Sequence, residues 1–202
     1  MTHKCYALLL AKTDSKRLPG KNEKIFYGEP MWKVNTRKCL ELFDKVFVSS
    51  NGIELLHEAW EMGAIPIERE KELCGDTPNI PVYQHALEKM GDADSIVAVQ
   101  VNSPTIASQL IEVAKVMMES GVPELMTCHK DYSIYGSVWG IQVNKLKNYG
   151  DPYKPTPWAL LVDNSVDIHT QEDYEKALRQ AAFSYPHISV EKYVDKLGTT
   201  HP

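Results

Sequence analysis

The sequence predicts a single α/β domain with a mainly parallel central sheet that is covered by helices on both faces. Three observations support this prediction. Short, continuous apolar runs such as residues 5–10 and 95–100 are typical of strands buried on both faces. Segments with apolar residues at helical spacing alternate with these runs along the chain. The length of 202 residues is that of one domain rather than two.

The pattern of apolar residues places the expected elements in order along the chain. The segments expected to form strands are 5–10, 45–50, 64–67, 95–100, 123–128, 135–143 and 165–168. The segments expected to form helices are about 30–42, 51–62, 78–90, 106–119 and 170–182. Because strands and helices alternate, we expect ligand sites beyond the carboxyl ends of the strands.

Several residues mark the expected helix boundaries. Pro30 and Pro78 can each occupy the first turn of a helix, where no backbone N–H is needed. Thr77 is expected to cap the helix that begins at Pro78 with its hydroxyl. Gly63 is expected to end the preceding helix. The sequence TQED at residues 170–173 is typical of a helix cap and marks the start of the last helix.

The whole chain, residues 1–202, is expected to form one domain without internal repeats. Residues 144–157 are rich in Pro, Gly and Tyr and have no periodicity. Long irregular loops are often functional. The wider segment 135–165 is therefore a candidate dimerisation arm or substrate lid, and a plain surface connection is the alternative. Residues 183–202 are expected to form a C-terminal tail.

The composition argues against several classes of protein. The chain has 22 Lys and Arg residues against 27 Asp and Glu residues, which gives a net charge of −5. Binding to nucleic acid or to an acidic membrane needs an excess of cations over most of one face, so neither partner is expected. The four cysteines form no CxxC pair, so they indicate reduced thiols and a cytoplasmic location. No N-terminal apolar run is long enough for a secretion signal.

A basic loop directly after the first expected strand is the strongest functional signal. Four cations lie within ten residues, and they are Lys12, Lys16, Arg17 and Lys21. At the carboxyl end of a strand, such cations and the nearby backbone amides can hold a polyphosphate. A solvated basic loop is the alternative, but the position after a buried strand and the turn at Pro19-Gly20 favour a phosphate site. The loop contains neither GxxxxGK[ST] nor GxGxxG.

Residues 11–22 (AKTDSKRLPGKN) resemble the signature loop of the CMP-sugar cytidylyltransferases, the family of CMP-N-acetylneuraminate and CMP-Kdo synthetases, usually written A-R-x-G-S-K-R-x-P-x-K-N. Further segments resemble family motifs in the same order from residue 5 to about 178. Residues 42–50 (LFDKVFVSS) resemble its second strand, 69–77 (REKELCGDT) its R-P-x-x-L-A-x-D-x loop, 100–104 (QVNSP) its Q-P-T-S-P, 135–142 (YGSVWGIQ) its N-G-A-I-Y, and 165–173 (SVDIHTQED) its S-V-D-I-D-T-x-E-D.

This resemblance implies a three-layer fold similar to the nucleotide-diphospho-sugar transferases. It also implies transfer of CMP from CTP to an acidic sugar or similar acceptor, with release of pyrophosphate. Lys21 would then hold the α-phosphate and stabilise the transition state, and Lys12 would assist it. The other nucleotide-binding residues implied are Leu10, Ala11, Ser15, Lys16, Asn22 and Arg69. The acceptor-binding residues implied are Gln100, Asn102 and Trp139.

The resemblance also implies a divalent metal ion. Mg²⁺ prefers carboxylates, phosphate oxygens and water, and Asp167 matches the family's catalytic metal ligand. His169 stands where the family has a second metal carboxylate, and because imidazole suits Mn²⁺ better than Mg²⁺, Mn²⁺ is the alternative ion. Asp14 replaces a small residue of the family's loop and is a candidate for the missing carboxylate. Lys12 replaces an arginine, so it offers a point charge instead of a bidentate fork.

The expected partners are CTP, a small acidic acceptor and a second copy of the chain in a homodimer. Thr105 and Ile106 stand where the family has Leu-Arg, so one cation that could hold the acceptor's acid is missing. Two alternatives therefore stay open. One is a non-catalytic homologue that binds CTP or a CMP-sugar, and the other is a nucleotidyltransferase that uses another nucleoside triphosphate, such as UTP with a sugar 1-phosphate.

Overall fold

The structure, a computed structural model, describes residues 2–184 of the chain. The strands in this part are β1 (Cys5–Leu10), β2 (Ile25–Phe26), β3 (Glu29–Pro30), β4 (Val46–Ser50), β5 (Ile65–Glu68), β6 (Ser95–Gln100), β7 (Glu124–Cys128), β8 (Ile134–Gln142) and β9 (Ala159–Val162). The α-helices are α1 (Met31–Leu42), α2 (Ile53–Glu61), α3 (Asn79–Met90), α4 (Ser108–Glu119), α5 (Val143–Lys147) and α6 (Gln171–Ser184). Two short 3-10 helices, η1 (Lys21–Glu23) and η2 (Lys71–Leu73), lie in loops.

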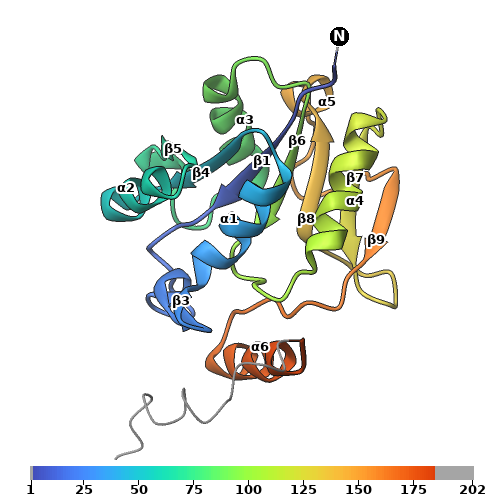
Figure 1. The fold of residues 1–202 in the computed structure, drawn as a ribbon. Helices are drawn as coiled ribbons and strands as arrows, with labels where there is room; N and C mark the ends of the chain where they lie inside the picture. Colours follow the sequence, from blue (N-terminus) through green and yellow to red (C-terminus); the bar gives the residue numbers. More distant parts are fainter. Residues whose placement is uncertain (1, 185–202) are drawn as a thin grey trace, which may run out of the picture.

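A seven-stranded sheet in the order β5-β4-β1-β6-β8-β7-β9 forms the middle of the molecule (Figure 1). β5, β4, β1 and β6 are parallel, whereas β8 runs antiparallel to both of its neighbours. β9 is parallel to β7. The prediction of a mainly parallel sheet is therefore confirmed. β2 and β3 form a separate small hairpin.

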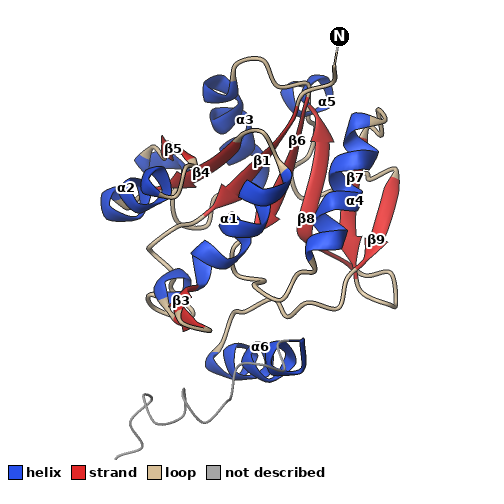
Figure 2. Ribbon diagram, viewed as in Figure 1, coloured by secondary structure: helices blue, strands red, loops and turns tan. Residues whose placement is uncertain are grey.

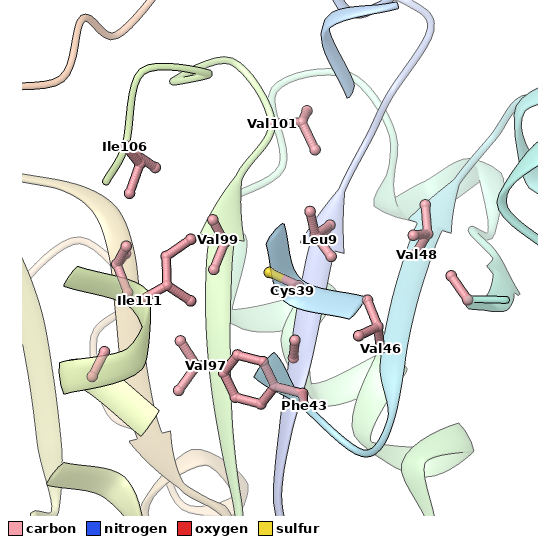
Figure 3. Packing of buried hydrophobic residues seen from close by; sticks show 14 of the residues in the cluster. Leu9, Cys39, Phe43, Val46, Val48, Val97, Val99, Val101, Ile106 and Ile111 are labelled. Carbon is pink, nitrogen blue, oxygen red and sulfur yellow. The ribbon is translucent and has the colours of Figure 1, made fainter. Parts of the chain in front are cut away.

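Helices cover both faces of the sheet, because successive side chains of a buried strand point to opposite faces. Cys5, Ala7 and Leu9 of β1 pack in a cluster with residues of α1, α2 and α4. Tyr6 and Leu8 pack in a second cluster with residues of α3 and α5. Figure 2 shows α1 and α4 in front of the sheet. Figure 3 shows part of the first cluster, in which side chains of β1, β4 and β6 face those of α1 and α4.

α6 does not belong to the helix layers on the two faces of the sheet, and it packs against the β2–β3 hairpin and the start of α1 (Figure 1). The cap predicted at residues 170–173 is confirmed. The Asp173 N–H donates to the Thr170 hydroxyl at 3.2 Å, and the Asp173 carboxylate accepts the Thr170 N–H at 2.8 Å. Tyr27 donates its hydroxyl proton to the Leu178 carbonyl at 2.7 Å. These contacts tie the end of the described chain to the residues that follow the basic loop.

Some expectations for individual elements are wrong. Residues 165–168 do not form a strand, because their backbone bonds the loop after β6 instead of a neighbouring strand. α3 begins at Asn79, and the Thr77 hydroxyl donates to the Cys74 carbonyl at 3.0 Å instead of capping the helix. β9 and the β2–β3 hairpin were not predicted, since both are very short runs inside segments that have no clear periodicity.

The segment 135–165 supplies β9, α5 and nearly all of β8, so much of it is built into the sheet. Its role in contacting a second copy stays a prediction. The fully buried Glu124 carboxylate holds the segment 135–165 in place. It accepts hydrogen bonds from Trp139 Nε1 at 2.8 Å and from Tyr149 Oη at 2.7 Å. Lys145 Nζ pairs with the same carboxylate at 2.5 Å. Residues 183 and 184 belong to α6, and residues 185–202 of the expected tail lie outside the described residues.

We expect Gly140→Ala to lower the free energy of unfolding by about 1–3 kcal/mol, because extra atoms in a packed core force their neighbours to move. A Cβ at Gly140 in β8 would lie 2.7 Å from the sulfur of Met118 and 2.9 Å from Cγ of Leu125, and both residues are fully buried. Urea unfolding measures the change. Gly150→Ala is the matched control, since nothing lies within 4 Å of a Cβ there. Equal effects of the two substitutions would contradict the packing argument.

Candidate active site

A cavity of about 270 Å³ opens where β1 and β6 end. It collects residues from the basic loop, from the loops after β5 and β6, from β8 and from the segment before α6. The predicted site residues that line it are Leu10, Lys12, Ser15, Lys21, Asn22, Arg69, Gln100, Asn102, Asp167 and His169. The structure therefore brings together most of the residues that the sequence singled out, although they lie far apart in the chain.

Lys21 projects into this cavity from the first residue of η1. The turn before it needs a glycine, because Gly20 has a φ of 62°, in the left-handed region. Lys21 Nζ donates to the Ile168 carbonyl at 3.0 Å, across 147 residues of sequence. Burial lowers the pKa of Lys21 to about 8, although the nearby Asp167 carboxylate acts in the opposite direction. The amine is thus partly desolvated, and a desolvated cation interacts more strongly with an anion than an exposed one.

The other residues of the basic loop leave polar atoms ready for a ligand. Asn22 Nδ2 donates to the Lys12 carbonyl at 2.7 Å, which fixes the loop, and Lys12 Nζ donates to the Gly75 carbonyl at 2.7 Å. The Asn22 Oδ1 and Ser15 Oγ atoms are buried and have no hydrogen-bond partner among residues 2–184. Buried polar atoms usually have a partner. The Ser15 hydroxyl can donate to a phosphate oxygen, whereas Asn22 Oδ1 can only accept, so the two atoms fit a ligand that carries both anionic oxygens and hydrogen-bond donors.

Arg69 also lines the cavity, and it is buried. It donates to the Ser49 carbonyl from Nη2 at 2.9 Å and to the Ser49 hydroxyl from Nε at 3.3 Å. Burial lowers the pKa of Arg69, which nevertheless stays a cation at any physiological pH. The Ala11 N–H also donates to the Ser49 carbonyl, at 2.9 Å. Arg69 and the end of β1 are therefore fixed to β4 and form a rigid wall.

Asp167 reaches the cavity from the segment before α6. Its carboxylate accepts a hydrogen bond from the Asn102 side chain through Oδ1, and its Oδ2 lies 2.8 Å from His169 Nε2. The Ile168 N–H donates to the Asn102 carbonyl at 2.9 Å. His169 Nδ1 is buried and has no hydrogen-bond partner among residues 2–184. The carboxylate is thus held from two sides and shares the cavity with Lys21.

Four predicted site residues do not line the cavity, and their proposed roles stay predictions. Lys16 is exposed and pairs with Asp76 at 2.8 Å. The Asp14 carboxylate accepts the Gly75 N–H at 3.1 Å, so it joins two loops instead of facing Asp167. Ala11 is buried behind the loop. Trp139 is buried in the core, where its ring lies edge-on to Tyr83 and its N–H donates to Glu124.

Nine cavity residues were missing from the predicted set, and Arg17, Tyr135 and Ser137 are three of those with polar side chains. Tyr135 and Ser137 lie two residues apart in β8 and so share one face of the sheet. Both donate hydroxyl protons to Asp163, with a Ser137 distance of 2.6 Å. Burial alone would raise the pKa of Asp163, but its hydrogen bonds from Ser137, Ser165 and Tyr135 outweigh burial and lower it. The alternation within residues 135–142 is the signal that could have identified this pair.

A second cavity of about 420 Å³ lies beside Asp163, Ser165 and Lys176. It is larger, but it contains no residue of the basic loop and neither Asp167 nor Arg69. The smaller cavity is therefore the candidate active site.

Among the described residues, no helix is long and apolar enough to span a bilayer.

Comparison with known proteins gives consistent results. The family model described as cytidylyltransferase matches residues 6–187. A curated pseudaminic acid cytidylyltransferase of Campylobacter jejuni is 32% identical over 93 residues, which cover 44% of this chain and 40% of that protein. The chain therefore matches less than half the length of this relative.

Two solved structures share the fold. A CMP:2-keto-3-deoxy-manno-octonic acid synthetase complexed with CTP has a TM-score of 0.72 at 15% identity, covering 90% of this chain and 99% of that chain. A manganese complex of Rv0371c from Mycobacterium tuberculosis H37Rv has a TM-score of 0.66 at 13% identity, covering 87% and 98%. The predicted three-layer fold similar to the nucleotide-diphospho-sugar transferases is thereby confirmed.

Proposed function

The chain belongs to the cytidylyltransferase family, and we propose that it transfers CMP from CTP to a small acidic sugar and releases pyrophosphate. One observation supports this proposal most strongly. Lys12 and Lys21, from the loop after β1, share a single cavity with Asp167, from the segment before α6. The cavity therefore contains both cations that can bind a triphosphate and a carboxylate that can bind a metal ion.

The chain's own residues have distinct roles in the proposed reaction. The acceptor hydroxyl oxygen forms a bond to the α-phosphorus of CTP, and the bond from that phosphorus to the oxygen bridging the β-phosphate breaks. The electron pair leaves with pyrophosphate, and the hydroxyl proton passes to solvent. Because negative charge builds up on the phosphate oxygens, positioned cations accelerate the step. We assign this stabilisation to Lys21, with Lys12 and Ser15 holding the remaining phosphate oxygens.

We assign some of the remaining cavity residues to binding the nucleoside and the others to binding the acceptor. Arg69 and the backbone at Leu10 are proposed to face the cytosine and its ribose, because they form the rigid wall beside the basic loop. Gln100 and Asn102 are proposed to orient the acceptor, since both follow from the end of β6. Tyr135 and Ser137 add hydroxyl groups to the same side. This side can hydrogen-bond the hydroxyls of a sugar.

A divalent ion fits the donor set. Among the described residues no three His, Cys, Asp or Glu side chains cluster closely enough to hold an ion by themselves. Mg²⁺ is commonly held by one or two carboxylates together with substrate phosphates and water, so Asp167 is a sufficient protein ligand. The ion would neutralise phosphate charge. We propose Mg²⁺, with Mn²⁺ as the alternative because His169 lies beside Asp167.

The pH dependence of CTP use follows from Lys21. We expect kcat/KM for CTP to fall as pH rises through about 8, because the pKa of Lys21 is lowered to about 8 and the neutral amine no longer attracts phosphate. Initial rates between pH 7 and 9 measure the profile. Lys21→Arg keeps its charge over this range, so its residual activity should show no such decline. A decline that persists unchanged in Lys21→Arg would contradict the assignment.

The proposed function is tested by pyrophosphate release from CTP with a panel of ulosonic acids, in Mg²⁺ and separately in Mn²⁺. Release that requires both an acidic sugar and CTP is the expected result. Competition binding with all four nucleoside triphosphates tests the base. Preference for UTP would favour transfer to another class of acceptor, and CTP binding without turnover in either metal would favour a non-catalytic binding protein.

We also propose a cytoplasmic homodimer. All four cysteines are free thiols, as is typical of a reducing compartment. β9 forms one edge of the sheet, and Trp158, Leu160 and Val162 are exposed along it. An apolar edge strand favours pairing with another chain. Light scattering during size-exclusion chromatography measures the mass, and a monomer at all concentrations would contradict the dimer.

A further inference from the structure

Two side chains of α1, Asn35 and Lys38, bind the loop that follows β6. Asn35 is fully buried, and its Nδ2 donates to the carbonyls of Gln100 at 2.8 Å and Ser103 at 2.9 Å. Lys38 Nζ donates to the carbonyls of Pro104 and Ile106, both at 2.7 Å. Lys38 Nζ also donates to Asn35 Oδ1 at 3.0 Å, which joins the two side chains.

The loop of residues 100–106, which Asn35 and Lys38 hold in place, forms hydrogen bonds with the segment that carries Asp167. Asn102 binds it twice, because its side chain donates to the Asp167 carboxylate and its carbonyl accepts the Ile168 N–H at 2.9 Å. Thr105 binds it once, since its hydroxyl oxygen accepts the Val166 N–H at 3.0 Å. Three consecutive residues, 166–168, are therefore fixed by two residues of the loop.

The two sets of contacts alternate along the loop. The carbonyls bound by Asn35 stand on either side of Asn102, and those bound by Lys38 stand on either side of Thr105. Neither Asn35 nor Lys38 lines the active-site cavity. We infer that Lys38, together with Asn35, is a positioning residue that sets the place of Asp167 through the loop of residues 100–106. This inference rests on the proposed metal-dependent CTP site.

The chemistry of Lys38 is consistent with this role. Its amine uses three donors on three acceptors, and no carboxylate lies within 4 Å of it among the described residues. Burial lowers the pKa of Lys38 to about 8, so the folded state places a desolvated amine here. Replacement by Met keeps most of the chain length but leaves two carbonyls and one amide oxygen without their donor. The loop would then lose one of its two anchors on α1.

Calorimetry of CTP binding, with Mn²⁺ and with EDTA, tests the inference without turnover. The readout is the metal effect, which is the Kd for CTP in EDTA divided by the Kd for CTP in Mn²⁺. Loss of a group that orients a metal ligand typically lowers metal affinity by about 10- to 100-fold. Because Lys38 acts through the loop, we expect Lys38→Met to lower the metal effect by about 10-fold, the low end of that range. The Kd in EDTA should stay unchanged.

Matched variants separate positioning from a general loss of structure. Lys33→Met makes the same substitution in α1, at a residue that pairs with Glu58 at 2.6 Å, and it should keep the wild-type metal effect. Asp167→Asn should abolish the metal effect, and adding Lys38→Met to it should change nothing more. Thr105→Val removes the acceptor for Val166 at constant shape and should act like Lys38→Met. It serves as the test if Lys38→Met does not fold, which thermal unfolding shows.

The outcomes distinguish this inference from the proposed function. If Mn²⁺ does not tighten CTP binding to the wild-type chain, the proposed metal site is wrong and the inference is wrong with it. If the wild-type chain shows the metal effect and both Lys38→Met and Thr105→Val keep it, only the inference is overturned. Equal losses in Lys38→Met and Lys33→Met would also overturn it.

Discussion

We expect Lys21→Met to lower kcat/KM for CTP by about 10²- to 10³-fold, the loss typical of removing one group that stabilises transition-state charge. We expect its melting temperature to stay the same or to rise. Lys21 is partly desolvated, and among the described residues it has no ion-pair partner within 4 Å. Its pKa is lower in the folded state than in the unfolded chain, so at neutral pH the charged amine opposes folding. Removing the charge therefore removes the unfavourable free energy of burying the amine, and it also removes the contact with phosphate.

Steady-state rates with varied CTP and a thermal unfolding curve measure both halves of this result. Lys16→Met is the matched control, since Lys16 belongs to the same loop but is exposed and pairs with Asp76 outside the cavity. Its kcat/KM should fall by less than tenfold. Similar losses in the two variants would mean that the loop acts by its net charge. A marked drop in melting temperature for Lys21→Met would assign the amine a structural role instead.

We expect Glu124→Ala to lower the free energy of unfolding by about 3–5 kcal/mol, because removing one member of a buried ion pair leaves the other charge uncompensated. Glu124 is fully buried and binds Trp139, Tyr149 and Lys145. Trp139 and Tyr149 would lose their acceptor, and Lys145 would keep only its hydrogen bonds to Thr156. Chemical unfolding followed by tryptophan fluorescence measures the change.

An exposed glutamate provides the comparison for Glu124. Glu119 pairs with Lys115 at 3.6 Å on the surface of α4, and exposed pairs of this kind contribute little. Glu119→Ala should therefore change the free energy of unfolding by less than about 1 kcal/mol. If Glu124→Ala is equally mild, the buried carboxylate does not hold residues 143–158 in place.

The sequence was sufficient to predict six of the seven strands of the sheet and the presence of Lys21 and Asp167 in one cavity. Buried parallel strands have continuous apolar runs, and the ends of such strands meet at one edge of a sheet, so motifs that follow β1 and β6 had to lie together. Asp167 was placed by its motif alone, because its own segment is not a strand. The structure shows that the loop after β6 holds that segment.

Two kinds of residue position were harder to predict: how far along a strand a side chain lies from the site, and which distant loop a side chain contacts. Tyr135, Ser137 and Trp139 share one face of β8, but Trp139 lies about 7 Å further along the strand than Ser137. It therefore falls under α3 in the core, although the motif placed it at the site. Asp14 binds the backbone of Gly75, in a loop 61 residues away. No local pattern around Asp14 contains that information.

The order of elements along the chain has a consequence for biosynthesis. β9, the last strand of the sheet, ends at Val162, before Asp167 and the Ile168 carbonyl that binds Lys21. A ribosome-bound chain that has emerged only as far as β9 contains every strand of the seven-stranded sheet, yet Asp167 and His169 of the candidate active site are still missing. The proposed nucleotide site is therefore complete only after the residues of α6 have emerged and packed beside the β2–β3 hairpin.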